Sequence, residues 1–315
     1  MPAQIINFLT EPLLLGLIWS VLALGVFIAY RVLDIADLSV EGVLPLTAAF
    51  GIWIINQGCN PVIAIFLTII LGALCGIITA SLHVFLKIPT LLSGIIMMTG
   101  LLTFILIINP GNINIADGKA TIFTYLNAVF SSAMGNLIGT WLSEFIIVGI
   151  IVAICVILLY LFFGSNLGIS IRATGKNKTM SKACGINVSL MIIIGLAISS
   201  GLVGLAGGLL GQHQGYVSTT SGKGTIVIGL ATLFLGEVAL GKKSFKINLL
   251  SIIIGAFIYW YIIDAIQLIP NFDSKYLYLV QAMIMILVMA VPYLVRLIQD
   301  EYKRRKAGGT CARID

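Results

Sequence analysis

The sequence predicts an all-α integral membrane protein with about nine transmembrane or partly spanning helices in two inverted repeats. Of its 315 residues, 59% are hydrophobic and only 10% are charged, whereas a soluble domain has roughly 25% charged residues. Too few polar side chains are present to cover a surface that faces water. The apolar runs are longer and more continuous than the alternating segments of about ten residues that form outer-membrane strands, and they fit membrane-spanning helices, which need about 20 apolar residues.

Nine apolar segments follow one another along the chain. They lie at about 13–30, 43–56, 62–86, 90–108, 142–163, 189–210, 225–240, 248–268 and 276–297. Residues 57–61 are expected to form a tight turn, and 211–224 a glycine-rich polar turn. The stretch 109–140 has no clear span and is expected to form an outside loop with a short surface helix. Residues 1–297 therefore form one transmembrane domain, followed by a tail at 298–315.

Basic residues set the expected orientation, because cytoplasmic loops carry an excess of Lys and Arg. Alternation of nine spans places four basic segments on one side: Lys87, the 172–182 cluster, Lys242 with Lys243 and Lys246, and the tail from Arg296. We expect that side to be cytoplasmic, with the N-terminus outside and the C-terminus inside. The net charge of +6 fits this bias without a nucleic-acid partner.

The segments 13–108 and 189–297 have the same order of elements: a long span, a polar turn, a short helix, a turn and two long spans. One span separates them, so the second half is inverted relative to the first. Inverted repeats are typical of transporters, whose substrate path runs at the repeat interface. Each half also contains a Gly-xxx-Gly pair, Gly72 with Gly76 and Gly204 with Gly208, a spacing that lets membrane helices approach closely.

The two short apolar segments are the candidate translocation site, because interrupted helices at matching places in two halves are a sign of such sites. Asp37 and Ser39 are expected to cap the first short helix, and Glu41 would lie in its first turn, where the helix dipole favours an anion. Thr225 stands at the start of the second short helix. The alternative is that these are only capped helices beside a loop, and the residues alone do not decide between the two.

Few ionisable side chains lie inside the spans. They are His83, Glu144, Glu237 and Asp264, and none lies clearly at mid-depth. No series of acids and histidines suggests a proton relay, which disfavours an ion-coupled transporter.

The chain carries no catalytic, metal-binding or nucleotide-binding motif. Residues 236–243 have the Gly and Lys spacing of a phosphate loop, but the Ser or Thr that would hold magnesium is missing and an apolar helix precedes the segment. The five cysteines show neither metal spacing nor a paired pattern. We therefore expect a protein that is not an enzyme and holds no metal or cofactor of its own.

The polar segment 168–187 is the clearest functional signal. It carries Arg172, Lys176, Lys178 and Lys182 and no acid. Residues 173–184 are compatible with one short helix that ends at Gly185. Such a basic surface helix, fixed between two spans, is what a soluble motor protein can grip. A loop that only sets the orientation would carry the same charges, so this alternative stays open.

Three stretches resemble the permease subunits of bacterial ABC importers in the branched-chain amino acid and ribose permease superfamily. The resemblance is closest to the subgroup associated with tryptophan or tyrosine uptake. Residues 37–42 (Asp-Leu-Ser-Val-Glu-Gly) are similar to the Asp-Leu-Ser-Val-Gly stretch of the sugar permeases, with Glu41 where Gly is usual. Residues 171–187 resemble the cytoplasmic coupling segment, and residues 224–237 resemble the second short helix of the amino-acid branch.

The resemblance covers about 13–297 and implies a permease that moves a small polar metabolite, most simply an amino acid and in this subgroup an aromatic one, inward by alternating access. Its implied partners in a bacterial cytoplasmic membrane are an ABC ATPase subunit that binds ATP and Mg, an extracytoplasmic substrate-binding lipoprotein and a second permease copy. The ATPase would dock on a coupling segment at about 165–188.

The site residues follow from the motif and from the short helices. The coupling motif assigns ATPase coupling to Arg172, Ala173, Thr174, Gly175, Asn177 and Gly185. The short helices place Asp37, Ser39, Glu41 and Thr225 on the translocation path. A secondary transporter or channel that works without an ATPase is the alternative, because the inverted halves alone are compatible with it.

Overall fold

The computed structural model describes residues 2–108, 111–116, 118–124, 136–241, 245–268 and 274–290. Lys242, Lys243, the tail 298–315 and much of the expected surface helix within 109–140 lie outside the described residues. In the part of the chain that is described, six helices are long and apolar enough to cross a membrane and three apolar helices are shorter. The all-α membrane fold and its nine apolar helices are thus confirmed.

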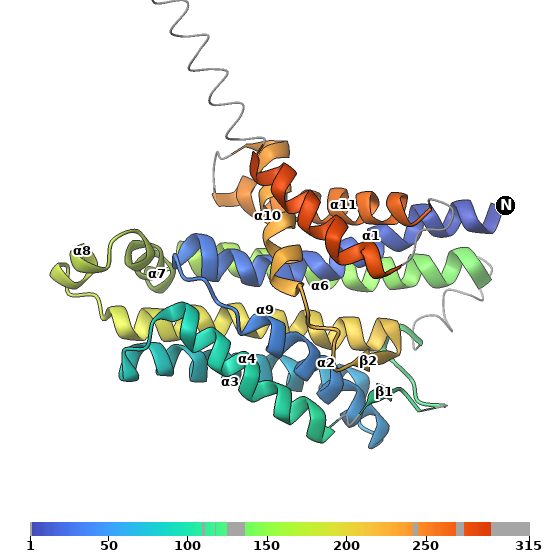
Figure 1. The fold of residues 1–315 in the computed structure, drawn as a ribbon, viewed down its shortest axis with the longest axis horizontal. Helices are drawn as coiled ribbons and strands as arrows, with labels where there is room; N and C mark the ends of the chain where they lie inside the picture. Colours follow the sequence, from blue (N-terminus) through green and yellow to red (C-terminus); the bar gives the residue numbers. More distant parts are fainter. Residues whose placement is uncertain are drawn as a thin grey trace, which may run out of the picture.

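The helices follow the predicted order (Figure 1). They are α1 (Pro2–Phe27), α2 (Val40–Asn56), α3 (Pro61–Leu86), α4 (Thr90–Ile108), α6 (Asn136–Gly164), α7 (Asn166–Lys176), α8 (Lys178–Ala183), α9 (Val188–Gln214), α10 (Thr225–Leu240), α11 (Phe245–Gln267) and the unlabelled helix Leu277–Ala290. A π-helical turn, η1 (Ile28–Val32), continues α1. Two short antiparallel strands, β1 (Asn112–Asn114) and β2 (Tyr216–Ser218), were not predicted.

The predicted turn between the second and third spans is confirmed, and local chemistry explains it. The Asn60 side chain accepts a 2.9 Å hydrogen bond from the N–H of Val62, and Pro61 opens α3 at a position that needs no N–H donor. The predicted turn at 211–224 is wrong for its first residues, because α9 continues to Gln214. Gly211 packs closely on Ala48 of α2, and the extra helical turn fills that contact.

The two ends of the molecule differ. α7 and α8 lie at one end, which we call the coupling end, and β1 and β2 lie at the other, the strand end (Figure 1). At the strand end the buried side chain of Gln212 donates to the carbonyl of Pro61 and accepts from the N–H of Ile122. Asn56 similarly bonds the carbonyl of Asn114 and the N–H of Ala116. These amide side chains tie the connecting loops to the helix ends.

Glycines bring α3 and α9 into close antiparallel contact, as the Gly-xxx-Gly spacing predicts. A Cβ atom on Gly72 would meet the backbone of Ser200 and Gly204, and one on Gly204 would meet the backbone of Thr68 and Gly72. The same device joins α10 to α11, where Gly236 lies on the backbone of Ser251 and Gly255 lies on Thr232. Close backbone approach replaces the hydrophobic driving force that is missing between helices in lipid.

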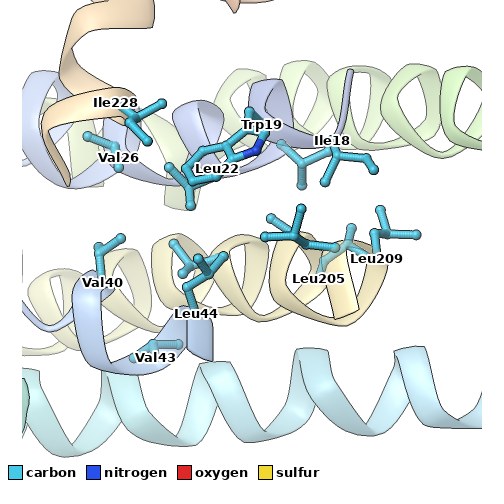
Figure 2. Packing of buried hydrophobic residues seen from close by; sticks show 14 of the residues in the cluster. Ile18, Trp19, Leu22, Val26, Val40, Val43, Leu44, Leu205, Leu209 and Ile228 are labelled. Carbon is cyan, nitrogen blue, oxygen red and sulfur yellow. The ribbon is translucent and has the colours of Figure 1, made fainter. Parts of the chain in front are cut away.

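The main core lies where α1, α2, α9 and α10 meet. Figure 2 shows Val26 of α1 beside Ile228 of α10, with Leu44 of α2 and Leu205 of α9 in the same cluster. α1 is buried around most of its length, whereas α4 and α6 expose many large apolar side chains. The two short helices are therefore enclosed by longer ones that provide the lipid-facing surface.

Replacing Gly204 by Ala tests the close helix contact. The new Cβ would press on the backbone of α3, which cannot move away as a flexible side chain can. We therefore expect a loss of stability of about 1–3 kcal/mol, measured as a lower melting temperature in detergent. Gly100→Ala is the matched control, because Gly100 lies in α4 with no atom within 4 Å of its added Cβ. A melting temperature of Gly204→Ala equal to that of the control would contradict the packing described here.

Candidate functional site

The N-terminal ends of the two short helices meet inside the molecule. α2 begins at Val40 after the irregular segment 33–39, and α10 begins at Thr225 after a glycine-containing turn. Gly222 of that turn lies directly on the backbone carbonyl of Glu41, where a side chain would not fit. We call this place the helix crossing. It brings together segments that are about 180 residues apart in the sequence.

Glu41 joins the two short helices at the helix crossing. It lies in the first turn of α2, as predicted, and its Oε1 accepts a 3.2 Å hydrogen bond from the N–H of Gly224, just before α10. Free N–H groups at a helix start carry partial positive charge and favour an anion. One carboxylate therefore stands at the positive ends of two helices. Lys223, the residue before Gly224, is exposed, so the crossing also offers a cation.

Asp37 precedes α2 and is buried, with 4% of its surface exposed. Its Oδ1 accepts a 2.9 Å hydrogen bond from the N–H of Ser39, while its Oδ2 has no partner among the described residues. Asp37 also lines a cavity of about 160 Å³ between α1 and α10, whose other walls include Tyr30 and Ile226. The irregular segment thus places a carboxylate in an otherwise apolar space.

The expected cap by Ser39 is wrong. Ser39 occupies the N-cap position, but its backbone already has helical angles (φ −63°, ψ −22°), and its side chain makes no capping bond. A cap residue needs an extended backbone for its oxygen to reach back to the first free N–H groups. Asp37 supports the turn before the helix instead, by holding the N–H of Ser39.

Thr225 is fully buried at the start of α10. Its Oγ1 donates a 2.6 Å hydrogen bond to the carbonyl of Gly222. The hydroxyl therefore stabilises the turn that carries Gly222 and Gly224. The structure thus gathers Asp37, Ser39, Glu41 and Thr225 around the two helix starts, with Glu41 alone among them only half-buried.

The coupling segment forms two helices rather than the single helix expected over 173–184. α7 ends at Lys176, Asn177 has an extended backbone (φ −157°, ψ 102°), and α8 follows. The break has a local cause: the Asn177 side chain accepts a 2.9 Å hydrogen bond from the N–H of Met180 and so caps α8. Gly185 ends the segment with φ +80°, a left-handed conformation that glycine adopts without strain, as predicted.

α7 packs directly on η1, the π-helical turn that follows α1. Gly175 lies against the carbonyl of Val32 and the Cα of Leu33, so closely that a Cβ atom would not fit. Ile171 and Thr174 on the same face are fully buried. η1 therefore contacts the coupling segment on one side and leads into the helix crossing on the other.

Arg172 and Ala173 lie on a second face of α7. The Arg172 guanidinium carbon is 5.4 Å from the ring centroid of Phe245 in α11, and its Nε is buried without a hydrogen-bond partner among the described residues. Arg172 and Ala173 both line a hollow that also includes Arg31 of η1.

An ion pair between the two halves was not predicted. Arg31 of η1 lies 2.9 Å from Oε1 of Glu237, near the end of α10, and also bonds Oε2 at 3.3 Å. Both residues stand out in the sequence as charges near span ends, but nothing in it pairs residues 206 positions apart. At the strand end, His213 and Glu144 lie 3.5 Å apart. In the described part of the chain, no three His, Cys, Asp or Glu side chains are grouped so as to hold a metal.

Comparison with known proteins fits this geometry. Residues 8–289 match the model of the family described as "Branched-chain amino acid transport system / permease component". The chain belongs to this permease family. It is a multi-pass membrane protein and a permease component of an ABC-type transport system, as the resemblance of its coupling segment implied.

Several proteins are similar to this permease over most of their length. A tyrosine transport system permease protein of Clostridioides difficile is 36% identical over 259 residues, covering 82% of this chain and 81% of that protein. An uncharacterised protein of Rickettsia prowazekii is 30% identical, covering 80% and 85%. The ribose import permease protein of Escherichia coli K12 is 26% identical, covering 81% and 76%. No solved structure gives a significant match.

Proposed function

We propose that this permease imports an amino acid by alternating access, driven by a separate ATPase that docks on α7 and α8. The observation that carries the proposal is the seating of α7 by Gly175 on η1. A partner that pulls on α7 would act directly on η1, which connects α1 to the irregular segment before the helix crossing. ATP and Mg would be bound by the partner, because the only phosphate-loop-like stretch of this sequence lacks the magnesium-binding hydroxyl.

The arrangement of the helices supports alternating access. α1 packs on α9, α10 and α11, and correspondingly α9 packs on α1, α2 and α3. Glycine contacts show that α3 runs antiparallel to α9. Gly16 lies on Phe257 and the Phe27 ring on that of Phe245, so α11 runs antiparallel to α1. α2 leads from the helix crossing to the strand end (Figure 1), whereas α10 leads from it to the ion pair of Glu237 with Arg31 of η1. The bundle of α1, α10 and α11 can therefore rock against the bundle of α2, α3 and α9 around a central site.

An amino acid is the substrate class that the helix crossing suits best. The Glu41 carboxylate can match the ammonium group of an amino acid. The Lys223 ammonium, with the positive end of a helix dipole, can match its carboxylate. Glu41 stands where the resembled sugar permeases have Gly, so the added charge distinguishes this chain from carriers of a neutral sugar. The similar tyrosine permease supports an aromatic amino acid.

The remaining partners are proposed from the family. A second copy of the chain would complete the pathway, and a substrate-binding lipoprotein would deliver the amino acid at the strand end. The coupling end would face the cytoplasm, because Lys87, the basic residues of α7 and α8, and Lys246 all lie at that end. The N-terminus, at the strand end (Figure 1), would then lie outside.

Thiol labelling tests the orientation. Cys59 in the turn at the strand end and Cys184 after α8 are exposed, whereas Cys75 and Cys155 are buried. In a Cys311→Ser background, we expect a membrane-impermeant maleimide to label Cys59 on intact cells and Cys184 only after permeabilisation. Cys59→Ser and Cys184→Ser variants assign each signal. Labelling of Cys184 on intact cells would place the coupling segment outside and end the proposal.

Gly175→Ala tests coupling. The added Cβ would collide with the carbonyl of Val32, so α7 should be displaced from η1 while the spans still fold. In liposomes that contain the permease, its ATPase and its binding protein, we expect ATP-driven uptake to fall at least about tenfold. Gly164→Ala at the same end of the molecule, where the added Cβ meets nothing within 4 Å, is the control. Uptake without any ATPase would instead favour a secondary transporter.

Glu41→Gln tests the substrate class. The amide keeps an acceptor for the N–H of Gly224 but loses the charge, so binding of an ammonium group should weaken by about 1.5–3 kcal/mol, or roughly 10- to 150-fold in tyrosine uptake at low concentration. Glu11→Gln removes the same charge from an exposed position in α1, outside the segment that leads to the crossing, and should leave uptake unchanged. Equal uptake by both variants would remove Glu41 from the pathway.

A further inference from the structure

A hollow at the coupling end has no ligand in the function proposed so far, although Arg172 and Ala173, two of the residues assigned to coupling, line it. It has a volume of about 570 Å³ and lies between η1, α7 and the first turn of α11. Its lining residues include Ile169, Arg172, Ala173 and Lys176 of α7 and Phe245 and Asn248 of α11. Four of them, at positions 169, 172, 173 and 176, form one stripe of α7, because residues three and four apart share a helix face. This stripe is separate from the buried face with which α7 sits on η1.

The hollow carries a surplus of positive charge. Arg31, Arg172 and Lys176 line it, and the Glu237 carboxylate neutralises Arg31 through their ion pair. In the described part of the chain, no carboxylate pairs with Arg172 or Lys176. The Nε of Arg172, a hydrogen-bond donor, is buried and lacks a partner there. A buried polar atom without a partner is costly unless a bound group satisfies it.

The surroundings of the hollow are those of a membrane interface. Phe27, Val32, Ile169 and Phe245 give it apolar walls. On the other side of the first turn of α11, a groove of about 290 Å³ is lined by apolar residues of α6 and α11, with Lys246 4.7 Å from the ring centroid of Tyr160. Both features lie where membrane-spanning α6 ends and α11 begins, which is the depth of lipid headgroups.

We propose that this hollow binds the phosphate group of an anionic phospholipid. Arginine and lysine side chains bind phosphate through charge-assisted hydrogen bonds, and the planar guanidinium matches its geometry. Basic pockets between membrane helices on the cytoplasmic side are suited to acidic headgroups. The apolar walls and the neighbouring groove favour a lipid over a free ion, because they accommodate the acyl chains. The lipid would fill the space beneath α7 and hold the coupling segment at the membrane surface.

Lipid titration of the purified permease tests the proposal. Native mass spectrometry would compare binding of phosphatidylglycerol, phosphatidylcholine and inorganic phosphate to the wild-type chain and to two double variants. In Arg172→Gln/Lys176→Gln both unpaired cations of the hollow are removed. Lys178→Gln/Lys182→Gln removes the same charge from the exposed surface of α8, outside the hollow.

We expect the wild-type chain to prefer phosphatidylglycerol and the Lys178→Gln/Lys182→Gln variant to keep that preference. The Arg172→Gln/Lys176→Gln variant should bind it roughly 30-fold more weakly, which corresponds to about 1 kcal/mol for each cation. If that variant does not fold, Lys176→Gln alone should show a loss of about fivefold. Inorganic phosphate should compete only weakly.

Three results would overturn the proposal. Equal loss in both double variants would show general surface attraction, and equal affinity for the two lipids would show no headgroup recognition. Inorganic phosphate that binds as tightly as the lipid would show an ion site. Because the binding assay contains neither an ATPase nor a transported substrate, its result does not depend on the proposed transport function.

Discussion

The need to satisfy backbone polar groups inside the molecule governs the helix crossing. Irregular backbone at membrane depth is tolerated only where protein or a water-filled cavity satisfies it. Here Asp37 holds the N–H of Ser39, Glu41 holds the N–H of Gly224, and Thr225 bonds the carbonyl of Gly222. The side chains that make the crossing chemically distinctive are thus also the ones that allow two helices to begin there. A carboxylate that is only half-buried, such as Glu41, can exchange one partner for another at little structural cost.

Glycines set which parts of the molecule are rigid. α3 with α9 and α10 with α11 are joined by backbone contacts through Gly72, Gly204, Gly236 and Gly255. At these glycines no side chain separates the two backbones, so we expect each pair of helices to move as a unit. The π-helical turn η1 is different, because its hydrogen bonds join residues five apart instead of four. The N–H of Leu33, for example, donates to the carbonyl of Ile28 at 3.0 Å. Such turns often occur at functional sites.

The sequence was sufficient to predict the nine apolar helices, their order and which two are short. Apolar runs and the glycine-containing turns between them are local features that can be read from neighbouring residues. It also placed Glu41 in the first turn of α2 and Gly185 at the end of the coupling segment. It did not reveal the break at Asn177, because the basic segment around it has no apolar helical periodicity whose interruption would mark the end of a helix. The Arg31–Glu237 pair and the strands were missed because they join residues far apart in the chain. The π-helical turn has no sequence signature that apolar periodicity can detect.

The segment 31–41, which we call the hinge segment, contacts both ends of α10. Arg31, at one end of the segment, pairs with Glu237 near the C-terminal end of α10, and Glu41, at the other end, bonds Gly224 at its start. Glu237 is thirteen positions after Gly224, which corresponds to about 20 Å as a helix. Glu41 is ten positions after Arg31, and this segment can bridge that length because most of it is not helical. Gly175 of α7 rests on the same segment at Val32. We infer that a displacement of α7 would shift both attachments of α10 together, so that one movement at the coupling end reaches the helix crossing along this segment.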